Sequence, residues 1–188
     1  IAGSSAAAQL ESVLPPRNYF HWPLEFPSVK GFNSIIGNPP FLPGSEIAAQ
    51  YGQRYAEYVR SCLTSRPATG RADLVTAFIR RSLNLVDQSA SEAATIGLLA
   101  TASIIEGQSL DGGLAIAEAE GFRLYRACSP SPWPGAASVS VVRVWLESRA
   151  TERRRFLNSE EVDTLSVRLR SDEVYEPKLQ RIQANASL

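Results

Sequence analysis

The stretch Ser34-Ile35-Ile36-Gly37-Asn38-Pro39-Pro40-Phe41 decides both the fold and the chemistry that this sequence predicts. It begins with a short apolar run that is typical of a strand. Asn38 then offers a side-chain carbonyl and Pro39 a main-chain carbonyl, and the two prolines hold both acceptors rigid. Phe41 adds a flat apolar face on which a ring can stack. The stretch indicates a site that acts on a planar nitrogen. The alternative is a proline turn that closes a strand and leaves Phe41 in the core.

Helical and strand patterns alternate along the rest of the chain. The expected helices span residues 47–62, 75–86 and 110–117, and the expected strands span residues 34–37, 95–101, 122–127 and 137–146. The last two strands follow one another across a short Pro-rich loop. This order predicts an α/β fold whose sheet is mostly parallel with an antiparallel edge pair. Ligands of such sheets bind beyond the carboxyl ends of the strands, where residues 38–41 lie.

The composition fits one domain, or one domain with an appendage. Hydrophobic residues make up 44% of the chain and charged residues 20%, which is enough for a core. The formal net charge is zero, so we do not expect a complete DNA-binding surface on this chain alone. The longest uncharged apolar stretch, residues 93–105, is too short to span a bilayer. Cys62 and Cys128 have neither metal-site nor disulfide-framework spacing. These features predict a soluble, cytoplasmic protein without a membrane partner.

Further motifs accompany the opening stretch in a definite order. They are Phe20-His21-Trp22-Pro23-Leu24-Glu25-Phe26-Pro27, Gly31-Phe32-Asn33-Ser34-Ile35-Ile36-Gly37-Asn38-Pro39-Pro40-Phe41, Arg71-Ala72-Asp73-Leu74-Val75-Thr76-Ala77-Phe78-Ile79, Ile96-Gly97-Leu98-Leu99-Ala100-Thr101 and Ser131-Pro132-Trp133-Pro134-Gly135-Ala136-Ala137-Ser138-Val139. With these motifs, residues 20–148 resemble the adenine-specific DNA methyltransferases. The resemblance is to the large single-chain enzymes of restriction-modification and phage-defence systems in particular.

This resemblance implies the second half of a class I (Rossmann-like) methyltransferase sheet. It also implies transfer of a methyl group from S-adenosylmethionine to the exocyclic amino group of adenine in double-stranded DNA. Asn38 and Pro39 would accept the hydrogens of the amine and aim its lone pair at the methyl group, and Pro40 would hold the loop. Because that amine is inaccessible in a duplex, the adenine must be flipped out. Phe41 and Trp133 would then stack on the base.

The loop that holds most of the cofactor in this family has no counterpart near the beginning of the chain. Family members bind S-adenosylmethionine through a Gly-rich loop upstream of the Asn-Pro-Pro-aromatic motif. In residues 1–37 the only glycines are Gly3, Gly31 and Gly37. We therefore expect a catalytic-half fragment that is inactive alone, with the main cofactor-binding half preceding it.

The expected organisation has three parts. Residues 1–19 would form a helical lead-in, residues 20–148 the catalytic half-domain, and residues 149–188 a connector toward a downstream recognition domain. Within the half-domain, Asn38 and Asp73 are the residues that the resemblance places beside the cofactor. Asp73 is also expected to open a helix, where the helix dipole favours a carboxylate.

Two other functions remain open from the sequence. Protein glutamine methyltransferases share an Asn-Pro-Pro-aromatic loop and act on a planar amide, although the aromatic residues around Trp22 and the Pro-rich loop around Trp133 favour the DNA enzymes. A degenerate, non-catalytic module that helps a partner to bind DNA is the second alternative. With His21 as the single histidine and two scattered cysteines, no metal site is expected.

Overall fold

The computed structural model describes residues 25–63, 71–86, 92–134, 138–149, 151 and 153–171. The helix expected within residues 1–19, the motif residues 20–24 and the tail beyond residue 171 lie outside the described part of the chain.

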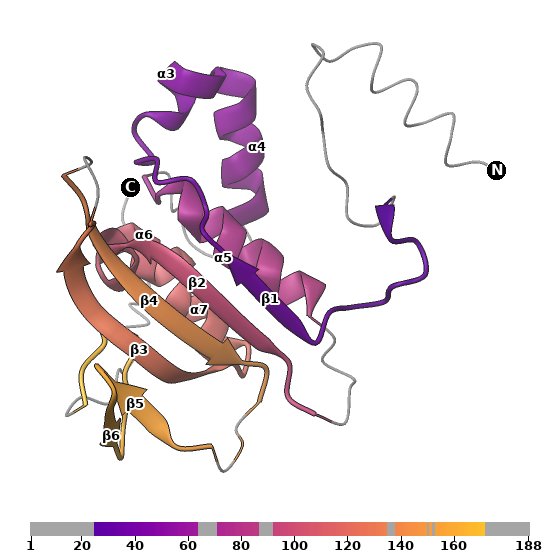
Figure 1. Ribbon diagram of the computed structural model, residues 1–188. Helices are drawn as coiled ribbons and strands as arrows, with labels where there is room; N and C mark the ends of the chain where they lie inside the picture. Colours follow the sequence, from indigo (N-terminus) through magenta and orange to yellow (C-terminus); the bar gives the residue numbers. More distant parts are fainter. Residues whose placement is uncertain are drawn as a thin grey trace, which may run out of the picture.

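The described strands form a six-stranded sheet in the order β1-β2-β4-β3-β5-β6 (Figure 1). They are β1 Ser34–Gly37, β2 Thr95–Thr101, β3 Arg123–Pro132, β4 Ser140–Glu147, β5 Arg155–Leu157 and β6 Glu160–Val162. Strands β1, β2, β3 and β5 run in one direction, while β4 and β6 run in the opposite direction. The predicted α/β class is confirmed, with most strands running in one direction and antiparallel pairs at β2–β4, β3–β4 and β5–β6.

The antiparallel pair lies further inside the sheet than expected. β3 and β4 pair antiparallel, but β4 inserts between β2 and β3, and the β5–β6 ribbon continues the sheet beyond β3. The physical reason lies in β4, whose Val142, Val144 and Leu146 are all buried. A strand this apolar is stabilised most when neighbours pair with it on both sides. The short and polar β6 takes the edge instead.

Helices cover one face of the sheet (Figure 1). They are α5 Leu74–Leu85, α6 Gly107–Gly112 and α7 Leu114–Ala119, and a short 3-10 turn, η1 Ala102–Ile105, precedes α6. Ile79 of α5, Leu110 of α6 and Leu114 of α7 are fully buried in the main core together with Ile96 and Val144 of the sheet. This core packs the three helices against the sheet.

Two glycines break helices that the sequence pattern extends without interruption. The helix expected over residues 47–62 is divided into α3 Ile47–Tyr51 and α4 Gln53–Leu63 by Gly52, whose φ is +89°. The helix expected over residues 110–117 is divided at Gly113, where an added Cβ would lie 2.7 Å from the carbonyl oxygen of Ser109. Apolar periodicity does not register either break, because each depends on backbone geometry.

The segment after residue 148 differs from the connector that the sequence suggested. β5 pairs with β3, and β6 pairs with β5. Leu165, Val167 and Leu169 are buried in the main core. The described residues of this segment therefore complete the same domain. Its strands are only 3 residues long each and rich in charge, so local patterning does not reveal them.

Candidate functional site

The Asn-Pro-Pro-Phe loop leaves the carboxyl end of β1. Asn38 is exposed, Pro39 is buried and Phe41 is half-buried. Leu42, the next residue, is 8% exposed and belongs to a second apolar cluster that α4 and the start of α5 complete. The main-chain N–H of Leu74 donates to the carbonyl oxygen of Leu42 at 2.9 Å. The loop is therefore anchored directly after Phe41, while Asn38 faces solvent.

Strand direction brings a second aromatic residue to this loop. Because β1, β2 and β3 run in the same direction, their carboxyl ends meet at one edge of the sheet. Trp133 follows β3 directly and is half-buried. Its ring centroid lies 6.3 Å from that of Phe41, and the two ring planes meet at 85°. The structure thus brings together the two aromatic residues that the sequence singled out.

Hydrogen bonds hold the backbone of Trp133 and of the strand before it. Its N–H donates to the carbonyl oxygen of Val139 at 2.9 Å, which closes the loop between β3 and β4. Just before it, β3 carries a bulge between Cys128 and Ser131. Asn158, at the β5–β6 turn, accepts from the N–H of Ser129 and donates to its hydroxyl, both at 2.8 Å. A β-bulge re-aims the side chains that follow it, so this support bears on where Trp133 points.

Asp73 occupies the N-cap position of α5, as predicted, but its carboxylate does not cap the helix. One carboxylate oxygen accepts from the main-chain N–H of Gly44 at 3.2 Å. The other accepts from the hydroxyl of Ser103 in η1. The N–H of Asp73 itself donates to the hydroxyl of Ser109 at 3.0 Å. Sequence reasoning missed these partners, since each lies about thirty residues or more from Asp73 and no local pattern marks it.

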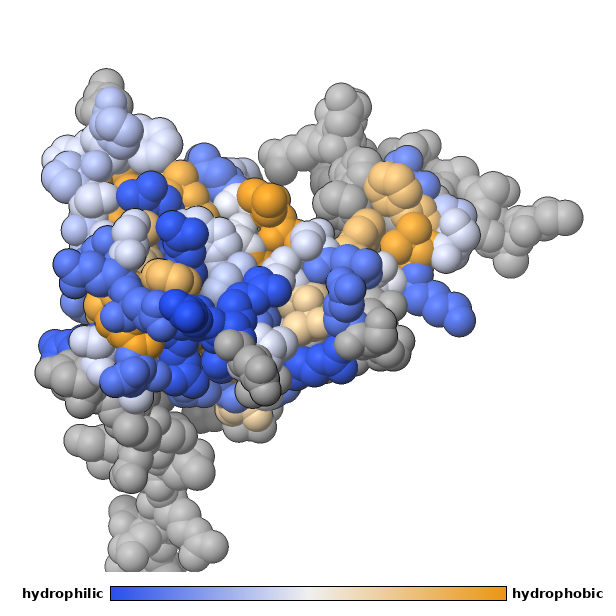
Figure 2. Space-filling view, turned by 60° about the horizontal axis from the view of Figure 1, so that its bottom comes forward, coloured by the Kyte–Doolittle hydropathy of each residue, from blue (hydrophilic) through white to orange (hydrophobic). Residues whose placement is uncertain are grey.

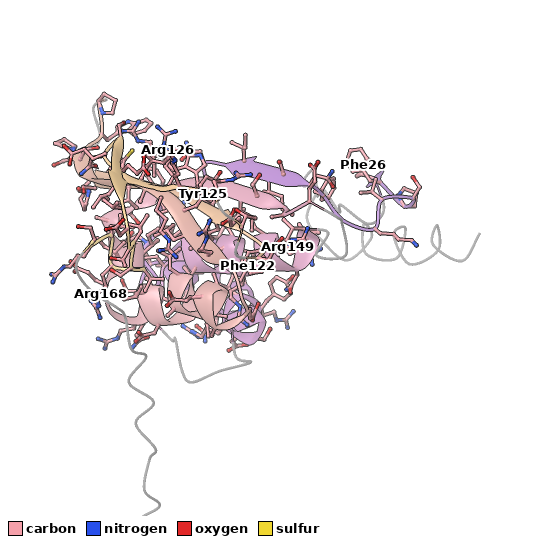
Figure 3. The ribbon with its side chains drawn as sticks, turned by 90° about the horizontal axis from the view of Figure 1, so that it is seen from below. Phe26, Phe122, Tyr125, Arg126, Arg149 and Arg168 are labelled. Carbon is pink, nitrogen blue, oxygen red and sulfur yellow. The ribbon has the colours of Figure 1, made fainter. Side chains whose placement is uncertain are left out.

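The arginine cluster after β4 is engaged within the chain. The guanidinium of Arg153 lies 4.7 Å above the ring of Tyr125, and that of Arg154 pairs with Glu161 at 2.8 Å. On β3, Arg126 lies 5.4 Å from the ring of Trp145. Figure 3 labels Tyr125 and Arg126 on this strand. Figure 2 shows that hydrophilic residues cover most of this side of the molecule, with hydrophobic ones in separate spots. The guanidinium groups of Arg126, Arg153 and Arg154 are therefore all in contact with other side chains of the same chain.

The described residues hold no cluster of His, Cys, Asp and Glu arranged for a metal ion. Within the same part of the chain, no helix combines the length and apolar character that crossing a membrane requires.

Sheet order, helix placement and the loop after β1 define a mixed α/β domain whose candidate site lies at the carboxyl ends of the strands. Residues 9–110 match the model of the Eco57I restriction-modification methylase family. Since this match covers more than half of the chain, the chain belongs to that family. No curated protein matches it.

Solved structures that resemble the chain include the following three. The Type IIL restriction-modification enzyme MmeI, solved in complex with DNA, shares 20% identity with a TM-score of 0.60, over 73% of this chain and 19% of that one. A modification subunit from Vibrio vulnificus YJ016 shares 12% identity at a TM-score of 0.44, over 63% and 23% of the two chains. The DrdV–DNA complex shares 14% identity at a TM-score of 0.39, over 66% and 14%. The likeness to MmeI shows the fold, and this chain spans about a fifth of the length of that enzyme.

Proposed function

We propose that this chain carries the catalytic loop of a DNA methyltransferase that moves a methyl group from S-adenosylmethionine to the exocyclic amine of adenine. The observation that carries the proposal is the pairing of Phe41 and Trp133 beside Asn38 and Pro39, at the carboxyl edge of the sheet. Membership of a restriction-modification methylase family supports DNA as the substrate.

The chemistry requires two acceptors on a weakly nucleophilic amine. The lone pair of this amine is delocalised into the adenine ring. Hydrogen bonds from its N–H groups to the Asn38 side chain and the Pro39 carbonyl favour a pyramidal nitrogen with a directed lone pair. Asn38 is exposed and so accessible to a substrate, and Pro40 limits the freedom of the loop. Placement and polarisation supply the catalysis, and no strong base is needed.

The angle between the two rings refines how a flipped adenine would bind. Because the planes of Phe41 and Trp133 meet at 85°, a flat base cannot stack face-on against both. A base that stacks on Phe41 presents its edge to the ring of Trp133. One ring then sets the plane of the base, and the other limits its sliding within that plane. We therefore assign face-on stacking to Phe41 and an edge contact to Trp133.

When bound, S-adenosylmethionine would supply the methyl group by breaking its S–CH3 bond and would leave as S-adenosylhomocysteine, while the methylated amine gives up one proton to water. Among the described residues, the exposed side chain of Asn38 fits a place next to the cofactor as well as to the amine. A direct contact between Asp73 and the cofactor stays a prediction, since its carboxylate already receives hydrogen bonds from Gly44 and Ser103.

The test is methylation by the intact protein, measured with labelled cofactor and followed by mass spectrometry of the digested nucleosides. We expect N6-methyladenine from the wild type and at least about a hundredfold less from Asn38→Ala. Asn84→Ala, at an exposed position on α5, serves as the matched control and should keep the wild-type rate. Label found in methylcytosine, or on the glutamine of a protein substrate, would reject the adenine assignment. No label in any of these products would reject the proposal as a whole.

A further inference from the structure

We propose that Asp73 is a positioning residue that holds the loop carrying Phe41 in its active geometry, through Gly44. This inference rests on the proposed function, because it concerns the same loop. It assigns Asp73 a role through the protein chain and not through the cofactor.

The loop is attached to the start of α5 at two neighbouring points. The first is the hydrogen bond between the Leu42 carbonyl and the N–H of Leu74, at 2.9 Å. The second is the hydrogen bond from the N–H of Gly44 to the carboxylate of Asp73, at 3.2 Å. Leu42 and Gly44 lie one and three residues after Phe41 in the sequence. The backbone of Phe41 is thus confined between a rigid proline pair on one side and this double attachment on the other.

Gly44 is the residue that permits this attachment. A Cβ added there would lie 2.4 Å from the carbonyl oxygen of Ala72 and 2.5 Å from that of Arg71. Real side chains essentially never approach a backbone so closely, so the loop reaches Asp73 only because position 44 lacks a side chain. Gly44 packs against the backbone of Arg71 and Ala72, and a backbone cannot rotate away as a side chain could.

Asp73 also ties this loop to the end of β2. The hydroxyl of Ser103 donates to Asp73, and Ser103 in turn lies 2.7 Å from the hydroxyl of Thr101, the last residue of β2. The N–H of Asp73 donates to Ser109 at the start of α6. One carboxylate therefore joins the loop after β1 to the segment after β2. A carboxylate suits this place because it accepts hydrogen bonds only, and both neighbours offer a donor.

The consequence for catalysis follows from distance sensitivity. A displacement of about 1 Å in a reacting group can cost about a hundredfold in rate. Removing the carboxylate frees Gly44 and Ser103 together, so the loop that carries Asn38 and Phe41 loses one of its two attachments. We expect kcat to fall about a hundredfold for Asp73→Ala, with the cofactor Kd changed less than about threefold.

The experiment uses the intact protein and four variants. Asp73→Asn keeps an acceptor for Gly44, and its amide can donate to Ser103, so this variant should stay within about tenfold of the wild-type kcat. Ser103→Ala removes one of the two bonds and should fall between Asp73→Asn and Asp73→Ala. Glu120→Ala, an exposed carboxylate at the end of α7, is the matched control.

Each variant is measured for single-turnover methylation, for cofactor Kd by calorimetry, and for hydrogen exchange of the peptide covering residues 38–46. The proposal expects faster exchange in this peptide for Asp73→Ala, with unchanged exchange in Glu120→Ala. Exchange at the wild-type rate in Asp73→Ala would overturn it. So would a weakened cofactor Kd at constant kcat, since this would place Asp73 against the cofactor.

The hydrogen-exchange readout separates this inference from the proposed function. If the wild type methylates no adenine, the proposed function fails, while the attachment of the loop is still tested by exchange. If Asp73→Ala does not fold, a fifth variant, Gly44→Ala, breaks the same attachment from the side of the loop, because an added Cβ would collide with the backbone of Arg71 and Ala72. Wild-type kcat and wild-type exchange of residues 38–46 in Gly44→Ala would overturn the positioning role.

Discussion

Replacing Phe41 with alanine removes one ring of the pair at the carboxyl edge of the sheet. Phe41 is only half-buried, and its ring centroid lies 6.3 Å from that of Trp133. Leu42 beside it remains buried and bonded to Leu74. The substitution therefore leaves the anchor of the loop intact, and we expect lost capture of the flipped base without unfolding.

The size of the loss follows from the geometry of the two rings. Stacking of a base on an aromatic side chain contributes about 1–3 kcal/mol, and about 2 kcal/mol for Phe41 is about thirtyfold in the equilibrium for base capture. The ring of Trp133 contacts only the edge of the base, so Trp133→Ala should lose about 1 kcal/mol, or about fivefold. Since the two rings also contact each other, the double variant should lose less than the sum of the single variants.

The assay is a DNA duplex with 2-aminopurine at the target position, which brightens when the base leaves the stack. Binding of the intact protein should brighten the probe, and Phe41→Ala should reduce that signal far more than Phe41→Trp, because any aromatic ring offers a stacking face. Trp133→Phe is the matched control for the second ring. If Phe41→Ala brightens the probe as strongly as the wild type, then Phe41 is a packing residue and the stacking role is refuted.

Three further predictions concern Asn38, the buried ion pair of Glu147, and the β5–β6 turn at Asn158. Asn38→Ala should leave the cofactor Kd nearly unchanged while kcat falls by at least about a hundredfold, and a rate within tenfold of the wild type would place Asn38 outside the site. Glu147→Gln should lower the free energy of unfolding by about 3 kcal/mol in urea titrations, because Glu147 is fully buried and paired with Arg123. The control Glu160→Gln, at an exposed position, should change the free energy of unfolding little. Equal unfolding midpoints for the two variants would contradict the pairing. Asn158→Ala should cost about 1–2 kcal/mol and Asn158→Gly less, since the φ of this residue is +53° and glycine tolerates that conformation; the reverse order would disprove the strain.

Local pattern was enough to predict the elements with strong periodicity. The strand expected at residues 95–101 is β2 with the same bounds, and the helix expected at residues 75–86 is α5 to within one residue. The position of Asn38 to Phe41 at the end of a strand was also predictable, because an apolar run followed by two prolines can neither continue a sheet nor enter a helix interior. These features depend on neighbours in the sequence.

The connections between distant segments were not predictable from local pattern. The place of β4 inside the sheet, the joining of β5 to β3, and the hydrogen bonds from Asp73 to Gly44 and Ser103 depend on which segments become neighbours in space. Sequence periodicity does not show which segments pair. Strand neighbours and hydrogen-bond partners depend on how the whole chain buries its apolar residues.

The candidate site depends partly on the sequence alone and partly on the tertiary structure. The sequence by itself determined that residues 38–41 would present two fixed acceptors and an aromatic ring, since Asn, Pro and Phe have those properties in any fold. The family motifs added Trp133 as a second aromatic residue, but only the tertiary structure decided that its ring lies across that of Phe41 at 85°. The reason is that β1 and β3 run in the same direction on either side of β2 and β4, so the two loops leave the sheet at the same edge.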